Sequence, residues 1–224
     1  LHDALPIFGV HVEEEMFYPY FAVFDFEAML EDVNEGNSAR LRWVQKHVLV
    51  SVSLCSNIPT LTRPHCIVEP DLDKLLDRML NCLTATQEAA YRLMLEKWSG
   101  MVHQIEAVKE KWGISEEEGE DEVGGTESQR RARKKMKTLV SDVERAFEDY
   151  CKCLPVIGFN SARYDLPLIK SKLAKIFHLN QSSKMVVKKS NIYTCLTTDR
   201  FKILDVSQYL APGHSYASFL KSFQ

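Results

Sequence analysis

Residues 20–27 read Tyr-Phe-Ala-Val-Phe-Asp-Phe-Glu, an aromatic and β-branched run that ends in two acids. Such a run favours a β-strand, and its nearly continuous apolar character predicts burial on both faces. Because side chains alternate along a strand, Asp25 and Glu27 are expected on one face and Phe26 on the other. The stretch therefore predicts a buried strand that carries two carboxylates on the same side of a sheet.

Strand and helix patterns continue on both sides of a central helical region. Alternating residues at 47–55 and a short apolar run at 65–69 predict two more strands, which favour an antiparallel meander with the first. The later patterns predict strands at 154–159, 184–188, 191–197 and 201–206 and helices at 164–177 and 215–223. The expected fold class is α/β, with a mixed sheet flanked by helices.

The central region begins with a long helical pattern. After Pro70, leucine and methionine recur at the spacing of an amphipathic helix. The capping-box pattern Thr84-x-x-Gln87 predicts that a second helix begins there. Gly113 is expected to end that second helix, because glycine adopts the left-handed conformation of a C-cap without strain.

A charged connection follows these helices. Residues 116–122 hold six acids in seven positions, which predicts a solvated loop. Residues 130–137 are its basic counterpart and open another long helical pattern. Two long helices joined by a charged loop predict a helical hairpin, so residues 71–150 are expected to be an insertion between two halves of the sheet. The basic run has three interpretations: a solvated helix face, a nuclear-localisation signal or a contact to a DNA backbone.

The composition is that of a globular protein. The chain has 224 residues, a net charge of −3, 45% hydrophobic residues, nine glycines and eight prolines, which excludes collagen-like and wholly disordered classes. No apolar run approaches the length of a membrane-spanning helix, so no membrane partner is expected. The near-neutral charge requires any nucleic-acid binding to be local. Six cysteines without a C-x-x-C spacing indicate reduced thiols in a nuclear or cytoplasmic protein.

A third acid follows the expected strand at 154–159. Asp165 ends the sequence Asn160-Ser-Ala-Arg-Tyr-Asp, where a strand gives way to a helix, and its carboxylate there can face the end of a neighbouring strand. Neighbouring carboxylates repel unless they are protonated or bridged by a hard cation such as Mg²⁺, and two such ions can assist phosphodiester hydrolysis. The alternatives are a solvated turn for the first two acids, helix capping for Asn160 or Asp165, and a core position or a base-stacking platform for Tyr164.

These segments resemble a known family. Residues 21–27 resemble the first exonuclease motif of family-B DNA polymerases, and residues 156–166 resemble the second. Residues 201–213 resemble the strand and turn that follow in the protein-primed branch of viruses, organellar plasmids and DNA transposons. The resemblance covers roughly residues 18–60 and 150–224, and it does not extend to the expected hairpin.

The resemblance implies an RNase H-like (DnaQ-like) domain with 3′–5′ proofreading activity, N-terminal to a polymerase domain. Asp25, Glu27 and Asp165 match the metal ligands, for which two Mg²⁺ or Mn²⁺ ions are implied. Asn160 and Tyr164 match positions that hold a single-stranded DNA 3′ end, and Ser207 is a further match of this kind. The implied partners are DNA, dNTP through the polymerase domain, and a terminal protein primer.

The family's third motif, Tyr-x-x-x-Asp, is expected beyond Gln224. The last three tyrosines of the chain do not form this motif, because the residue four positions later is not aspartate: Tyr193 is followed by Thr197, Tyr209 by Gly213 and Tyr216 by Leu220. The chain is therefore expected to be a fragment that carries three of four catalytic acids and is inactive alone. Its expected divisions are a non-native N-terminal segment at 1–17, half-domains at 18–70 and 151–224, and the insertion at 71–150.

Two other functions fit the same sequence. One is a stand-alone DEDD-type exonuclease, which shares the acids but lacks a polymerase. The other is a catalytically inactive interaction protein, in which the hairpin and its charged runs bind partner helices and the acids at 25 and 27 only form a turn. Binding of Mg²⁺ or Mn²⁺ separates the inactive protein from the two nucleases.

Overall fold

The computed structural model describes residues 18–33, 45–114, 126–173, 185–189, 192–210, 213 and 215–222. The chain forms two compact units. The hairpin unit comprises residues 1–19 and 91–152, and the sheet unit comprises residues 20–90 and 153–224. Each helix in the described ranges is too short or too polar to cross a lipid bilayer.

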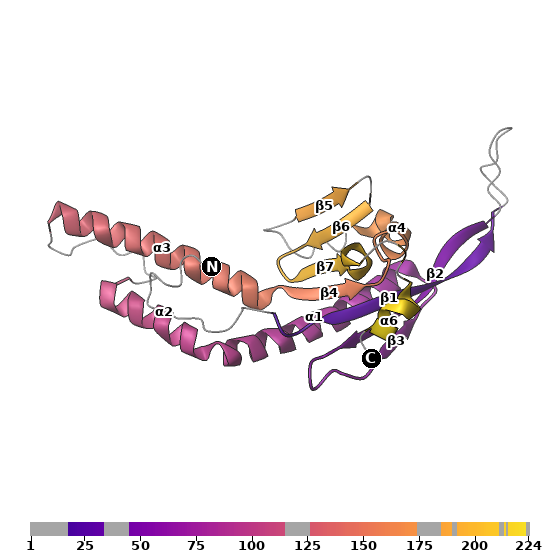
Figure 1. Ribbon diagram of the computed structural model, residues 1–224, viewed down its shortest axis with the longest axis horizontal. Helices are drawn as coiled ribbons and strands as arrows, with labels where there is room; N and C mark the ends of the chain where they lie inside the picture. Colours follow the sequence, from indigo (N-terminus) through magenta and orange to yellow (C-terminus); the bar gives the residue numbers. More distant parts are fainter. Residues whose placement is uncertain are drawn as a thin grey trace. The chain divides into compact units, whose positions relative to one another are not determined.

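The sheet unit contains a mixed seven-stranded sheet in the order β3-β2-β1-β4-β7-β6-β5 (Figure 1). Strands β1, β2 and β3 are antiparallel neighbours, β4 and β7 continue parallel to β1, and β6 and β5 return antiparallel. The expected meander and the α/β class with a mixed sheet are confirmed. The strands are β1 (Ala22–Asp32), β2 (Gln45–Ser56), β3 (His65–Val68), β4 (Leu154–Gly158), β5 (Met185–Lys189), β6 (Ile192–Thr197) and β7 (Phe201–Asp205).

Strand β1 is buried on one face only, so the expectation of burial on both faces was wrong. Phe24 and Phe26 are 5% and 2% exposed, whereas Asp25 and Glu27 on the other face are exposed. The reason lies in the pairing, because β1 has an antiparallel neighbour in β2 and such sheets can keep one face in water. Asp25 and Glu27 therefore share one face of the strand, as predicted, but this face is exposed to solvent and not covered by a second layer.

Helix α1 (Leu72–Lys97) is continuous through the expected start of a second helix at Thr84, so that boundary was wrong. The apolar stripe does not break there, since Leu83, Ala90 and Met94 are all buried. The capping-box pattern is overridden because the burial of this stripe outweighs a local capping preference. Residues of α1 and of β1 and β2 line one pocket together, which places the helix against the sheet face that carries Ala22.

The hairpin unit contains α2 (Ser99–Trp112) and α3 (Glu127–Lys152), which lie side by side (Figure 1). Helix α2 ends at Gly113 with φ 59°, so the expected glycine stop is confirmed. Helix α3 begins with a reciprocal capping box, in which the Thr126 amide donates to the Gln129 side chain and the Gln129 amide donates to the Thr126 hydroxyl. Lys109 of α2 binds Glu144 of α3 at 2.6 Å, which ties the two helices together. The acidic run 116–122 lies outside the described residues.

The helix expected at 164–177 is much shorter where the structure describes it. Helix α4 (Asp165–Leu168) has four residues, and a 3-10 turn η2 (Lys170–Lys172) follows it. The break occurs at Ile169, whose φ of −99° and ψ of 10° leave helical geometry. Residues 174–177 lie outside the described range. After β7 come the 3-10 helix η3 (Val206–Tyr209) and α6 (Tyr216–Ser222), which lies within the helix expected at 215–223.

Candidate functional site

The first two acids of the site are held by the regular pleat of β1. In the register with β2, Asp25 lies opposite Ser53 and Glu27 lies opposite Ser51. The pairing shifts directly after Glu27, so the acids occupy the last regular positions before an irregularity in the ladder. Irregularities of this kind re-aim side chains at the ends of regular pairing. The two carboxylates thus share one exposed face at a point where the strand changes course.

Asp165 comes to the same place from a distant part of the chain. Strand β4 is parallel to β1 and ends at Gly158, after which a turn leads into α4. The Oδ1 atom of Asp165 accepts a hydrogen bond from the Phe26 amide at 3.2 Å, across 139 positions of sequence. Asp165 is 2% exposed. Its carboxylate therefore lies against the backbone of the residue that separates Asp25 from Glu27.

The carboxylates affect each other's protonation. Burial and, to a smaller extent, the charges of Asp25 and Asp205 raise the pKa of Asp165 to about 6, although the hydrogen bond from Phe26 acts in the opposite direction. Burial and then the charge of Glu27 raise the pKa of Asp25 above its usual value. Repulsion among such neighbouring acids is relieved when a cation binds between them or when one of them takes up a proton.

A fourth acid, Asp205, had no role assigned from the sequence. It is 1% exposed at the end of β7. Its Oδ1 accepts hydrogen bonds from the amides of Asn160 at 2.8 Å and Ser207 at 2.9 Å, and its Oδ2 accepts one from the Ala162 amide at 3.1 Å. Asp205 therefore shapes the turn before α4 and supports the φ of 58° at Asn160. The available signal was its position, since Asp205 is the last residue of a short apolar strand.

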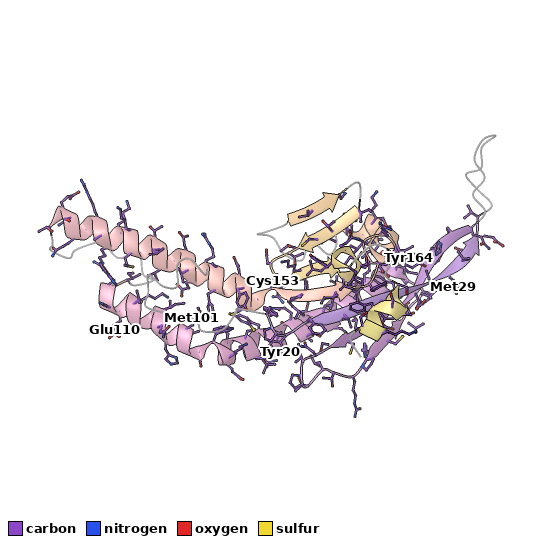
Figure 2. All side chains as sticks on the ribbon, in the orientation of Figure 1. Tyr20, Met29, Met101, Glu110, Cys153 and Tyr164 are labelled. Atoms are coloured by element: carbon purple, nitrogen blue, oxygen red, sulfur yellow. The ribbon has the colours of Figure 1, made fainter. Side chains whose placement is uncertain are left out.

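The three residues matched to single-strand contacts lie around this turn. Asn160 and Ser207 are joined through the one Asp205 oxygen that binds both amides. Tyr164, labelled in Figure 2, is 38% exposed and immediately precedes Asp165. Its hydroxyl lies 3.1 Å from Nδ1 of His47, and the two rings meet edge to face at 5.5 Å. His47 was not singled out, because an isolated histidine in a strand carries no sequence signal of such a contact.

Aromatic side chains extend from the same turn onto α6. Phe159 packs against Tyr216 at a ring distance of 5.1 Å and against Phe219 at 5.9 Å. Tyr216 remains 56% exposed, and Tyr209 on η3 is 71% exposed. Exposed rings beside a polar turn provide flat surfaces on which unpaired bases can stack.

The donor chemistry fits a hard cation, but the arrangement is not a closed cage. Carboxylate oxygens are the ligands that Mg²⁺ prefers, and Asp25, Glu27 and Asp165 supply them around Phe26 of β1. Within the described ranges, however, no group of three His, Cys, Asp or Glu side chains has the arrangement needed to hold a metal ion. One oxygen of Asp165 is engaged by the Phe26 amide. Binding of a metal ion by these three carboxylates therefore stays a prediction, and it requires the carboxylates to move closer together.

Compared with models of known protein families, with curated proteins and with solved structures, the chain matches none of them. The arrangement of the carboxylates, the polar turn and the exposed rings is thus the basis on which a function can be argued.

Proposed function

We propose that the sheet unit is the 3′–5′ exonuclease region of a family-B DNA polymerase of the protein-primed branch, with an RNase H-like fold. The observation that carries the proposal is the 3.2 Å hydrogen bond from the Phe26 amide to Asp165, which brings an acid of the second motif against the pair in the first. A mixed sheet flanked by helices is compatible with that fold. The sequence motifs and this contact support the same set of acids.

In this proposal Asp25, Glu27 and Asp165 hold Mg²⁺ or Mn²⁺. Bound in such a site, two ions would supply an activated water and charge stabilisation for the leaving oxygen of a phosphodiester. The chain's other residues position the strand. Tyr164 offers an exposed ring for a terminal base, and Asn160 and Ser207 offer polar contacts beside it. The aspartate of the family's Tyr-x-x-x-Asp motif and the polymerase chemistry belong to a longer protein in this proposal.

Mn²⁺ binding tests the site in the chain as it stands. Electron paramagnetic resonance of free Mn²⁺ gives the number of ions bound, and we expect the variants D25N and D165N to bind more weakly by tenfold or more (roughly 1.4 kcal/mol). The exposed acid Asp149 on α3 supplies a matched control, D149N, which should bind as the wild type does. Equal binding by all four proteins would remove the proposed metal site.

Exonuclease activity tests the reaction in a protein extended beyond Gln224. We expect such a protein to shorten a labelled single strand from its 3′ end only with a divalent cation. The double variant D25N/D165N should have no such activity. Activity that survives this double substitution would refute the assignment, whereas activity without any polymerase function would favour the stand-alone exonuclease.

A catalytically inactive interaction protein remains a second candidate. The absence of a three-ligand cage among the described side chains favours it. It predicts that Mn²⁺ binds no better to the wild type than to D25N/D165N, so the same titration decides between the two candidates.

A further inference from the structure

The charges of helix α3 are segregated along its length. Between residues 127 and 138 the helix carries six basic side chains and a single acid, Glu127. Between residues 139 and 152 it carries two basic side chains and four acids. The two cations of this second half both form ion pairs within the helix, Arg145 with Asp142 and Lys152 with Glu148. The excess of positive charge therefore belongs to the first three turns alone.

Most of these basic side chains form no ion pair with a described residue. Arg131 binds Glu127 at 3.1 Å, and Arg133 donates to the carbonyl of Gly113 at the end of α2. The other four form no hydrogen bond or ion pair within the part of the chain that the structure describes, and all four are exposed: Arg130, Lys134, Lys135 and Lys137. Their positive charges are not balanced by ion pairs there, and a cluster of like charges attracts partners of the opposite charge.

The apolar side of α3 is already used. Val140, Val143 and Phe147 are buried, and the ion pair between Lys109 and Glu144 holds α2 beside this helix. At 100° per residue, Arg130, Lys134 and Lys137 follow one another along a flank of the helix away from that stripe. A helix that binds a lipid surface needs an exposed apolar face beside its cations, and the basic turns have none. A polar polyanion fits this surface better than a membrane.

We propose that the basic end of α3, residues 130–137, binds the phosphate backbone of duplex DNA. The four cations without hydrogen-bond or ion-pair partners among the described residues lie within eight helical residues, which span about 12 Å, or one charge per roughly 3 Å of helix. Each strand of duplex DNA carries one phosphate charge per roughly 3.4 Å of the axis. The two charge densities match, and the chain's net charge of −3 makes this local patch necessary for any such contact. Binding of this kind positions the protein without reading sequence.

This surface lies in the hairpin unit, so its binding does not depend on the carboxylates of the sheet unit. It goes beyond the proposed nuclease, which needs only a single-stranded end. Loss of Mn²⁺ binding in D25N/D165N and loss of duplex binding in a variant of the basic end are separate measurements, so failure of one proposal leaves the other standing.

The test is a fluorescence-anisotropy titration of a labelled duplex of random sequence at salt concentrations from 50 to 300 mM, with the whole chain. The variant R130Q/K134Q/K137Q removes three unpaired cations at exposed positions. The matched control K74Q/K97Q/R145Q removes three exposed helical cations elsewhere and has the same net charge. Circular dichroism establishes that all three proteins have the same helical content.

We expect the wild type to bind with a steep salt dependence. Each phosphate contact contributes roughly 0.9 to the slope of log K against log salt, so the basic-end variant should lose about 2.7 from that slope. Its affinity at 100 mM salt should fall at least tenfold, while the control changes little. Equal losses in the two variants would show an effect of net charge alone and would overturn the proposal.

Two further results would also overturn it. Binding that appears only after the acids of 116–122 are changed to amides would show that this segment, and not DNA, occupies the basic end. Tighter binding to vesicles of anionic lipid than to the duplex would identify a membrane surface as the partner.

Discussion

Replacing Asp165 with asparagine should stabilise the metal-free protein at neutral pH. The side chain is 2% exposed, and burial raises its pKa from 3.8 to about 6. An acid whose pKa is raised on folding holds its proton more tightly in the folded state than in the unfolded state. The contribution of Asp165 to stability is therefore most favourable below about pH 4, falls as the pH rises to about 6, and then levels off. Asparagine has no charge to bury and retains an oxygen that can accept from the Phe26 amide.

The size of the effect follows from the shift. About 2.2 pKa units correspond to roughly 3 kcal/mol, at 1.36 kcal/mol per unit. We expect D165N to exceed the wild type in free energy of unfolding by up to about 3 kcal/mol at pH 8, and to be close to it at pH 3.5. Part of this difference is lost if the carboxylates relax or water enters, so a gain of about 1 kcal/mol already has the expected sign.

Urea unfolding followed by circular dichroism, in EDTA at pH 3.5, 5, 6 and 8, measures this difference. The exposed-acid variant D149N is the control and should show no pH-dependent change relative to the wild type. A difference between D165N and the wild type that stays constant from pH 4 to 6, or that favours the wild type at pH 8, would refute the reasoning. Excess Mg²⁺ should then reverse the order, because a bound ion stabilises only the protein that holds it.

Two further substitutions test the packing around the site, and one chemical modification tests the burial of a thiol in α3. Alanine at Gly158 would place its Cβ 2.5 Å from a side-chain carbon of Ser161, so G158A should lower the free energy of unfolding by about 1–3 kcal/mol. The control G100A should not lower it, because a Cβ at Gly100 meets nothing within 4 Å. Thermal melts of the two variants measure the difference. Removal of the Asp205 carboxylate leaves three backbone amides without their acceptor, so D205A should lower the free energy of unfolding by about 3 kcal/mol or more. Hydrogen exchange in the turn before α4 should also become faster. Exchange that stays slow there would contradict this role of Asp205. Burial raises the pKa of the Cys151 thiol to about 12, so iodoacetamide at pH 8 should modify it more slowly than the other five thiols. Peptide mass spectrometry measures the rate at each cysteine. Modification of Cys151 at the same rate as the others would show that its thiol is accessible.

Local pattern was sufficient for much of the secondary structure. The period-2 and period-3.6 patterns located the seven strands and helix α3, and Gly113 ended α2 as its backbone freedom suggests. The same-face placement of Asp25 and Glu27 also follows from the pleat alone. The patterns failed where packing competes with a local preference, as at Thr84, where a capping box lies inside a helix that a continuous apolar stripe stabilises.

Contacts between segments were decided only by the tertiary structure. Periodicity says which way a side chain points from its own strand or helix, but not which element covers it or which backbone group meets it. Strand β1 has one solvated face because of its neighbours in the sheet. Asp165 reaches the Phe26 amide, and Asp205 holds the turn beside it, because parallel strands end at a common edge of the sheet. Residues far apart in the chain meet there through strand order, which no local sequence pattern encodes.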